Sequence, residues 1–430
     1  MIPWLLISFF VLLFLGVPIA MSLGLAAIGG ILFLDGGNVV TIAQRMFEGM
    51  NSFALLAIPL YTFAGFTMSK GGISDRLMNF CYSIVGHIYG GLAHVNVLSS
   101  MIFAGISGSA VADTAGVSGM FMPTMIKQGY SKKFTVAVTA ISSTIGIIIP
   151  PSIPMVVIAG ICGLSTGKLF LGGIIPGIMC GLAQMIVSYL LAKREGVARE
   201  PGHFSIGPVL KGLWESWPAL LMPIIIVGTI MSGIVSPTEA GVIAVVYGLF
   251  AGGVIYRELK WEDIKFAFCE TVRVSGRIFI VIGAAKLYTV MLTTAGFDKW
   301  MAKTMLGIST NPTVILVMIL LLFFIVTMFM ESIATLTLFM PILYPIATGV
   351  GIDPIVMSVL ITVVIGIGLV TPPVGMCIYV ACDLMDIKVG EVLPTLLPFI
   401  GATVICIALM IAFPQLITVP TLLMKSGAVG

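Results

Sequence analysis

The sequence predicts an all-helical integral membrane protein built from two inverted repeats. Of its 430 residues, 59% are apolar, and the charged ones comprise only 21 Lys and Arg and 18 Asp and Glu. This charged fraction of 9% compares with about 25% in soluble globular proteins. A soluble chain of this composition would expose a large apolar surface to water. The composition therefore excludes a soluble enzyme, a nucleic-acid-binding protein and a disordered chain.

Apolar runs recur along the chain, and their length predicts helices. A helix needs about 20 apolar residues to cross the hydrocarbon core, which is far longer than a barrel strand. In the first half we expect a helical pair over 2–34 that is broken at Gly16–Pro18. Further apolar runs lie at 51–69, 92–126, 134–162 and 170–192. In the second half we expect a helical pair over 216–256 that turns at a Ser236-x-x-Glu239 capping box. An amphipathic stretch follows over 257–275, and further apolar runs lie at 276–296, 313–348, 355–382 and 392–418.

Short motifs recur in the same order in the two halves, which indicates an internal repeat. The matches are Leu60-Tyr61-Thr62 with Leu287-Tyr288-Thr289, Met122-Pro123 with Met340-Pro341, Pro150-Pro151 with Pro372-Pro373, and Pro176 with Pro398. The offset between the Met-Pro pairs also aligns Asp113 with Glu331. We therefore expect a first repeat over 1–192, a cytoplasmic connector over 193–215 and a second repeat over 216–430.

The distribution of basic residues predicts the orientation of these repeats. If 92–126 and 313–348 are re-entrant hairpins, one face carries fifteen of the 21 basic residues, in segments 70–76, 127–133, 193–211, 257–277 and 383–391. The opposite face carries five, namely Arg45, Lys168, Lys299, Lys303 and Lys425. The basic face is expected to be cytoplasmic, with both termini on the periplasmic side. Repeats of opposite orientation with broken helices are typical of secondary transporters.

Each long run at 92–126 and 313–348 has a small polar centre, which predicts two half-helices that meet at a tip. In the first run this centre is Ser107–Asp113, where Gly108 permits a chain reversal and hydroxyl and carbonyl oxygens become available. Oxygen ligands suit hard cations such as Na⁺. The alternative is that the small residues only let two helices pack closely, which leaves the intramembrane Asp113 unexplained.

Two proline pairs break the runs at 134–162 and 355–382. Pro150-Pro151 lacks two backbone donors, which frees carbonyl groups about one turn earlier, near Gly146. The matching break in the second half is Gly366–Gly375, and its partner tip is Thr327–Ser332. Two tips that meet two breaks predict two related cation sites beside a central cavity. A passive proline kink satisfied by neighbouring hydroxyls is the alternative.

Three ionisable residues lie inside apolar runs and need a partner or a water-lined cavity. Asp113 is a candidate cation ligand, a neighbour of the ligands, or a cap on a half-helix N-terminus, and Glu331 follows by repeat symmetry. Lys286 could attract an anionic substrate, contact another subunit or extend outward to the interface. No nucleotide-binding motif is present, so we expect no ATP hydrolysis and no cofactor apart from Na⁺ as coupling ion.

These motifs resemble the large membrane subunit of tripartite ATP-independent periplasmic (TRAP) transporters, over nearly the whole chain. The matching segments are Asn51–Leu60 (NSFALLAIPL), Ser107–Asp113 (SGSAVAD), Met122-Pro123 with Gly129-Tyr130, Ile149–Ser152 (IPPS) and Thr371–Gly375 (TPPVG). The resemblance implies an elevator-type fold like that of the ion transporter superfamily, with two hairpins and two broken helices. It also implies transport elements near 92–162 and 313–383, with the remainder as scaffold and 38–50 and 257–275 as candidate arms.

The resemblance further implies sodium sites and partners. One sodium site would comprise Ser107, Ser109, Asp113, Gly146 and Pro150. The second would comprise Thr327, Gly368, Thr371 and Val374, and residues bordering the ions or the substrate would be Pro151, Glu331, Gly366, Pro372 and Pro373. The implied function is sodium-driven import of an organic anion, a carboxylate or sialic acid, across the bacterial inner membrane. The partners would be a separate small four-helix membrane subunit and a periplasmic binding protein.

Two other functions remain open at this point. A stand-alone ion-coupled carboxylate carrier with a similar inverted-repeat fold would need no binding protein. A membrane-embedded aspartyl protease would use Asp113 and Glu331 as its pair of carboxylates, although no protease motif surrounds them.

Overall fold

The computed structural model describes residues 1–32, 39–197 and 205–423, and this part of the chain contains helices and no β-strands. Seven of the described helices are long and apolar enough to cross a membrane, and shorter apolar helices accompany them. The prediction of an all-helical membrane protein is confirmed. Lys425, counted above on the periplasmic face, lies outside the described residues.

The helices of the first half follow the predicted runs. They are α1 (Ile2–Phe14), α2 (Ile19–Gly30), α3 (Val39–Met50), α4 (Ala57–Lys70), α5 (Ile73–Val85), α6 (Gly91–Ser107), α7 (Ala110–Lys127), α8 (Lys132–Ser143), α9 (Ile153–Cys162) and α10 (Thr166–Arg194). The break before α2 falls where it was expected, because Gly16 adopts a positive φ of 82° and Pro18 precedes the first helical residue. A 3₁₀ turn at Thr144–Ile147 continues α8 toward the proline pair.

The helices of the second half follow in a similar order. They are α11 (Ile206–Met231), α12 (Pro237–Phe250), α13 (Trp261–Thr294), α14 (Phe297–Ile308), α15 (Pro312–Thr327), α16 (Ser332–Gly349), α17 (Pro354–Gly368), α18 (Met376–Met385), α19 (Val389–Ala412) and α20 (Gln415–Thr421). The predicted capping box begins α12, where the Ser236 N–H donates to Glu239 Oε2 at 2.6 Å. The Glu239 N–H in turn donates to Ser236 Oγ at 3.3 Å.

Two details of the helix pattern were predicted incorrectly or missed. The stretches 257–275 and 276–296 are not separate elements, because α13 runs through both as one helix of 34 residues. No proline lies inside it, and its two glycines, Gly276 and Gly283, lower helix stability without removing a backbone hydrogen bond. The short helices α5 and α14 were not predicted. Each follows a glycine with positive φ, Gly72 at 75° and Gly296 at 80°.

The structure corrects the alignment of the two hairpins. Helices α7 and α16 each contain 18 residues, and their N-caps are Ser109 and Glu331. The structural counterpart of Glu331 is therefore Ser109, and Asp113 corresponds to Thr335. The alignment of Asp113 with Glu331 is wrong by four residues, about one helical turn, because Met-Pro pairs alone are too short to set the register.

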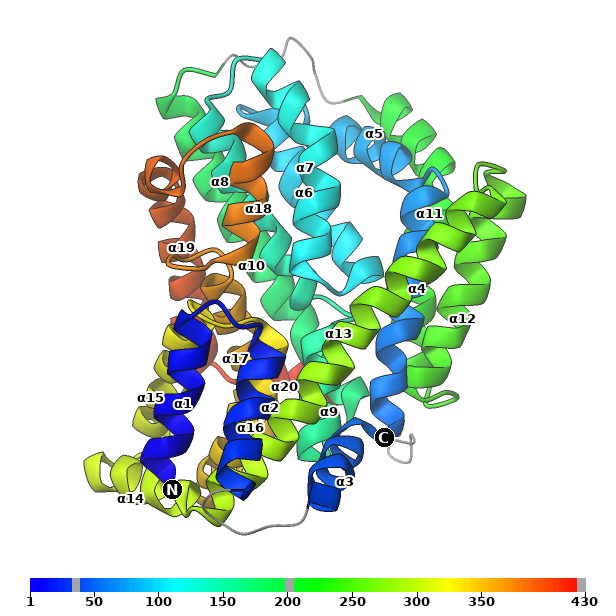
Figure 1. Cartoon of the computed structure of the whole chain (residues 1–430). Coiled ribbons are helices and arrows are strands. Elements are labelled where there is room, and N and C mark those ends of the chain that lie inside the picture. Colours follow the sequence, from blue (N-terminus) through cyan, green and yellow to red (C-terminus); the bar gives the residue numbers. More distant parts are fainter. Residues whose placement is uncertain (33–38, 198–204, 424–430) are drawn as a thin grey trace.

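The two halves are packed into one another (Figure 1). Helix α12 of the second half packs on α4 of the first, and α2 of the first half packs on α13 of the second. Buried tyrosines reinforce these contacts, because Tyr61 Oη donates to the Pro237 carbonyl at 2.7 Å and Tyr288 Oη donates to the Leu5 carbonyl at 2.8 Å. Neither half has a core of its own, which makes the pair one folding unit.

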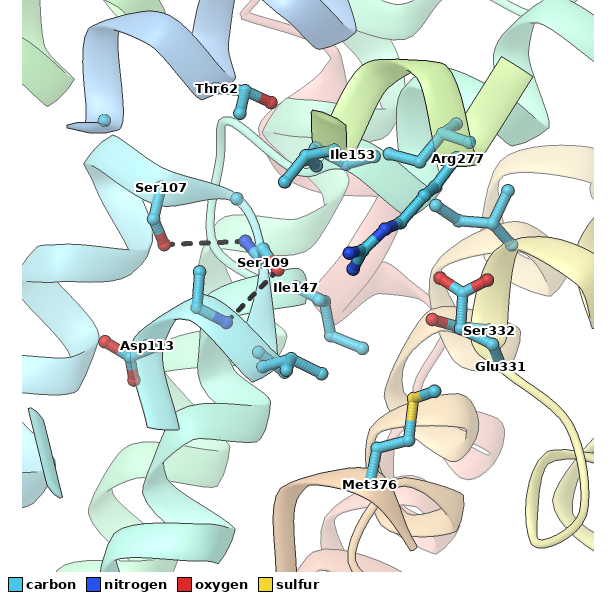
Figure 2. A pocket seen from close by; sticks show the side chains of 18 of the residues that line it. Thr62, Ser107, Ser109, Asp113, Ile147, Ile153, Arg277, Glu331, Ser332 and Met376 are labelled. Carbon is cyan, nitrogen blue, oxygen red and sulfur yellow. Dashed lines mark hydrogen bonds between the residues drawn. The ribbon is translucent and has the colours of Figure 1, made fainter. Parts of the chain in front are cut away.

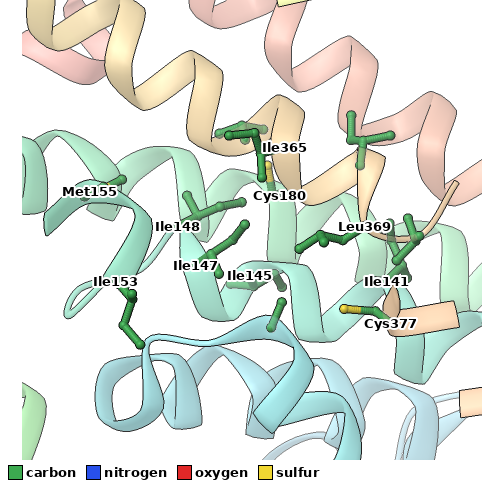
Figure 3. Packing of buried hydrophobic residues seen from close by; sticks show 14 of the residues in the cluster. Ile141, Ile145, Ile147, Ile148, Ile153, Met155, Cys180, Ile365, Leu369 and Cys377 are labelled. Atoms are coloured by element: carbon green, nitrogen blue, oxygen red, sulfur yellow. The ribbon is translucent and has the colours of Figure 1, made fainter. Parts of the chain in front are cut away.

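The hairpins α6–α7 and α15–α16 enter from opposite ends of the molecule and point their tips toward its middle (Figure 1). A buried apolar layer supports the first break. Ile145 and Ile148 contact α10 and α17 there (Figure 3). This layer holds the interrupted helix rigidly beside the hairpin tip.

Polar contacts gather the predicted basic segments on one face. Arg76 pairs with Glu258 at 2.6 Å, and this guanidinium holds the pKa of the Glu258 carboxyl below its usual value. Ser131 Oγ donates to Glu195 Oε1 at 3.0 Å, and Lys132 Nζ donates to the Met385 carbonyl at 3.1 Å. The cytoplasmic assignment of this face, the periplasmic termini and the repeat boundaries stay predictions.

Replacing Tyr288 by Phe tests whether the bond between the halves contributes to stability. The substitution removes the donor to the Leu5 carbonyl in a fully buried position, so we expect a loss of about 0.5–1.5 kcal/mol. The thermal unfolding midpoint in detergent measures this loss. Tyr379→Phe is the control, because Tyr379 is 48% exposed. Equal midpoints for the two variants would show that the Tyr288 bond adds nothing.

Candidate functional site

A cavity of about 980 Å³ lies between the tips of the two hairpins (Figure 2). Its walls are the start of α2, one face of α4, the tips of α6–α7 and α15–α16, and the middle of α13. Most of its lining side chains are apolar, and few polar or charged groups reach it. A concave apolar site with few polar groups is the usual form of a small-molecule binding site.

The first hairpin tip reverses the chain over only two residues. Ser107 ends α6, Gly108 adopts a positive φ of 63°, and Ser109 caps α7 by accepting a bond from the Ala112 N–H at 3.4 Å. Glycine is required at the turn, because a Cβ on Gly108 would lie 2.6 Å from the Pro151 carbonyl oxygen. The tip is therefore pressed against the break between α8 and α9.

The first predicted sodium site is brought together at this contact. A Cβ built on Gly146 would lie 3.6 Å from the Ser109 carbonyl oxygen and 3.7 Å from Asp113 Cβ. The Ile149 N–H donates to the Ile145 carbonyl at 3.1 Å, and Pro150 has no N–H to offer the Gly146 carbonyl. Ser107 begins the same turn. All five predicted residues thus belong to one junction of hairpin tip and broken helix.

Asp113 gives this junction its charge. Its side chain is 3% exposed, and neither carboxylate oxygen has a hydrogen-bond partner among the described residues. Asp113 borders the cavity, and its carboxylate is directed away from Arg277 (Figure 2). An unpaired buried carboxylate costs several kcal/mol unless a cation or donor compensates it. Carboxylate and carbonyl oxygens are the ligands that Na⁺ takes, so the residues fit a cation site.

The second predicted site is formed by the same kind of contact. A Cβ on Gly368, at the end of α17, would lie 2.6 Å from Thr327 Cβ at the end of α15. Thr371 Oγ1 donates to the Ile367 carbonyl at 2.7 Å, and the Val374 N–H donates to the Met328 carbonyl at 2.9 Å. Thr327, Gly368, Thr371 and Val374 therefore lie at one junction, as predicted.

The two junctions have equivalent hydrogen bonds between tip and break but differ in charge. The Ile153 N–H donates to the Gly108 carbonyl at 3.2 Å, which matches the bond from Val374 to Met328. At the position of Asp113 the second hairpin has Thr335, whose hydroxyl donates to the Glu331 carbonyl at 3.1 Å. The first junction carries a buried carboxylate, and the second is built from neutral groups.

The residues predicted to border the ions or the substrate do not form one group but lie at different positions in the structure. Glu331 lines the cavity at the start of α16, and its carboxylate points into it (Figure 2). Gly366 contacts Thr144, because a Cβ there would lie 3.2 Å from Thr144 Cβ. The Pro151 carbonyl contacts the first tip, as described above. Pro372 and Pro373 form the turn that joins α17 to α18.

Lys286 does not line the cavity. It lies beneath the arm α3, where a Cβ on Gly49 would be 2.6 Å from Lys286 Cβ. Arg45, through a hydrogen bond, and the charge of Lys286 hold the pKa of Glu48 on this arm below its usual value. The structure places Lys286 at the contact between α3 and α13, which argues against a direct role in attracting a substrate.

Two cavity cations were missed from the sequence. Lys70 and Arg277 both line the cavity, yet they were assigned to the cytoplasmic segments 70–76 and 257–277. The error for Arg277 follows from dividing α13 into two elements at that point. A usable signal existed, because Arg273 has an acidic neighbour in Glu270 whereas Arg277 has no acidic residue within four positions on either side.

Comparison with known proteins agrees with this architecture. The family described as tripartite ATP-independent periplasmic transporter, DctM component, matches residues 6–416. The chain is 36% identical over 404 residues to the sialic acid TRAP transporter large permease protein SiaM of Vibrio cholerae, covering 94% of each chain. It is 37% identical over 393 residues to the isethionate TRAP transporter permease protein DctMQ of Oleidesulfovibrio alaskensis, covering 91% of this chain and 62% of that protein.

A solved structure shares the fold. The YdaH transporter of Alcanivorax borkumensis superposes with a TM-score of 0.59 at 13% identity, covering 89% of each chain. These two relatives are named transporter permeases rather than enzymes, and Asp113 and Glu331 point in different directions (Figure 2), so nothing favours the protease alternative. From the matched family and these relatives, the chain belongs to the DctM component family of TRAP transporters, as a large permease subunit.

Proposed function

We propose that this permease subunit imports an organic anion, a carboxylate or sialic acid, across the bacterial inner membrane by sodium-coupled symport. The observation that carries the proposal is the buried Asp113 carboxylate, which lacks a hydrogen-bond partner among the described residues and lies beside freed carbonyls at a hairpin tip. A cation there compensates the charge, and the adjoining cavity has room for an organic anion. Family membership adds a small membrane subunit and a periplasmic binding protein as proposed partners.

Transport in this proposal is an elevator movement of the site. The mobile unit comprises both hairpins and both broken helices, α6–α9 and α15–α18. Helices α10 and α19 pack against α8 and α17, so we assign them to the mobile unit as well, which changes the expectation that they belong to the scaffold. The scaffold then comprises α1–α5 and α11–α14, and the hairpins slide along α4 and α13.

Asp113→Asn tests the first sodium site. The variant keeps the side-chain size but removes the negative charge, so the sodium concentration for half-maximal uptake should rise about tenfold or more. Uptake into proteoliposomes across a range of sodium gradients measures it. Asp383→Asn is the matched control, because Asp383 is exposed on α18. An unchanged sodium dependence in Asp113→Asn would contradict the assignment.

Gly368→Ala tests the second site. The added methyl group overlaps the Thr327 side chain, so the hairpin tip must move away from the break at a cost of about 1–3 kcal/mol. Sodium-dependent uptake should fall sharply while the protein still inserts. Gly401→Ala is the control, since a Cβ at Gly401 meets nothing within 4 Å. Full uptake by Gly368→Ala would show that this close contact is not needed.

Reconstitution separates the tripartite system from a stand-alone carrier. The permease and its small subunit are placed in proteoliposomes with an inward sodium gradient and a labelled organic anion. We expect accumulation only when purified periplasmic binding protein is added, and none when the sodium gradient is dissipated. Accumulation without the binding protein would establish the stand-alone alternative instead.

A further inference from the structure

The cavity contains two cations, and neither forms an ion pair within the described residues. Of its two cations, Lys70 places its ammonium 4.8 Å from the centre of the Phe266 ring, a cation–π contact at the edge of the cavity. Arg277 has neither an ion pair nor a hydrogen bond within the described residues. Its guanidinium extends between the two hairpin tips, toward Ser109 on one side and Glu331 on the other (Figure 2).

Arg277 differs in this respect from the arginine one turn earlier on the same helix. Arg273 forms an ion pair with Glu270 and does not line the cavity. A guanidinium keeps its charge at all physiological pH values and binds carboxylates through two parallel hydrogen bonds. A free guanidinium in a cavity with mostly apolar walls is therefore a strong carboxylate ligand.

The two hairpin tips add to the positive potential around Arg277. Helix α7 begins after Ser109 and α16 begins after Glu331, and the first residues of both helices line the cavity. Backbone N–H groups at a helix N-terminus favour an anion, and broken helices in transporters use them in this way. Three independent features thus favour negative charge in the same space.

Glu331 limits how much negative charge the cavity accepts. Its carboxylate faces the cavity on the wall opposite the first tip, whereas Asp113, which also borders the cavity, directs its carboxylate away from Arg277 (Figure 2). A second carboxylate on the substrate would lie near the Glu331 carboxylate, while the second cavity cation, Lys70, is held against the Phe266 ring. A hydroxyl or amide N–H on the substrate could instead donate a hydrogen bond to Glu331.

We propose that Arg277, on the scaffold helix α13, binds the carboxylate of the substrate between the hairpin tips before the mobile unit moves, and that Glu331 selects hydroxylated or amidated monocarboxylates over dicarboxylates. This inference rests on the proposed function, because it assigns the anion to the same cavity. It names the group that recognises the anion, which is separate from both sodium sites.

Ligand-induced thermal stabilisation of the purified permease with its small subunit tests the inference without the binding protein. In buffer containing sodium, N-acetylneuraminate and succinate are titrated separately against the wild type, Arg277→Gln, Arg277→Lys and Arg273→Gln. The wild type and Arg273→Gln should respond to N-acetylneuraminate at lower concentration than to succinate. Arg277→Gln should need about ten to a hundred times more N-acetylneuraminate, and Arg277→Lys an intermediate amount.

Glu331→Gln tests the selectivity. Removing its charge should improve the response to succinate relative to N-acetylneuraminate. The inference is overturned if Arg277→Gln responds like the wild type, if the wild type prefers succinate, or if neither anion stabilises it. A sodium titration without organic anion separates this failure from failure of the proposed function. Sodium should raise the thermal unfolding midpoint of the wild type and of Arg277→Gln equally. A wild type whose midpoint does not change with sodium would overturn the proposed function itself.

Discussion

The structure depends on the fact that backbone polar groups inside a membrane must find partners within the protein. Both hairpins and both broken helices end near the middle of the molecule, around the cavity. Helices α6, α8, α15 and α17 present carbonyl ends there, and α7 and α16 present N–H ends. Carbonyl ends suit a cation and N–H ends suit an anion, so the same interruptions provide for both solutes.

The bonds between tips and breaks make each junction a single mechanical element. The Gly108 carbonyl accepts a hydrogen bond from the Ile153 N–H, and the Met328 carbonyl accepts one from the Val374 N–H. Neither tip can therefore move away from its break without losing a hydrogen bond. The close contacts at Gly108 and Gly368 leave no room for a side chain at either position. A cation that binds between tip and break therefore stabilises the element as a whole. Rigid elements of this kind are what a site needs if it moves without changing its internal geometry.

Much of this arrangement was predictable because glycine and proline act locally. Gly108 and the two proline pairs interrupt their helices through their own backbone geometry, without help from tertiary packing. The hairpins, the breaks and the residues at each junction were therefore predictable from the sequence. The continuity of α13 did not, because only tertiary packing carries the helix through its charged first half. Arg277 was missed for the same reason, because dividing the helix at 275–276 left it in a segment assigned to the cytoplasmic face.

The difference in charge between the junctions suggests how the two solutes assist each other. The first junction holds Asp113, and the cavity beside it holds Glu331, so two carboxylates lie around a space that must accept an anion. Without a cation, Asp113 repels that anion and opposes the attraction of Arg277. Sodium bound at the first junction cancels this repulsion, and the anion in turn favours sodium by the same free energy. Coupling then requires no conformational signal between the sites, only their proximity in an apolar surrounding.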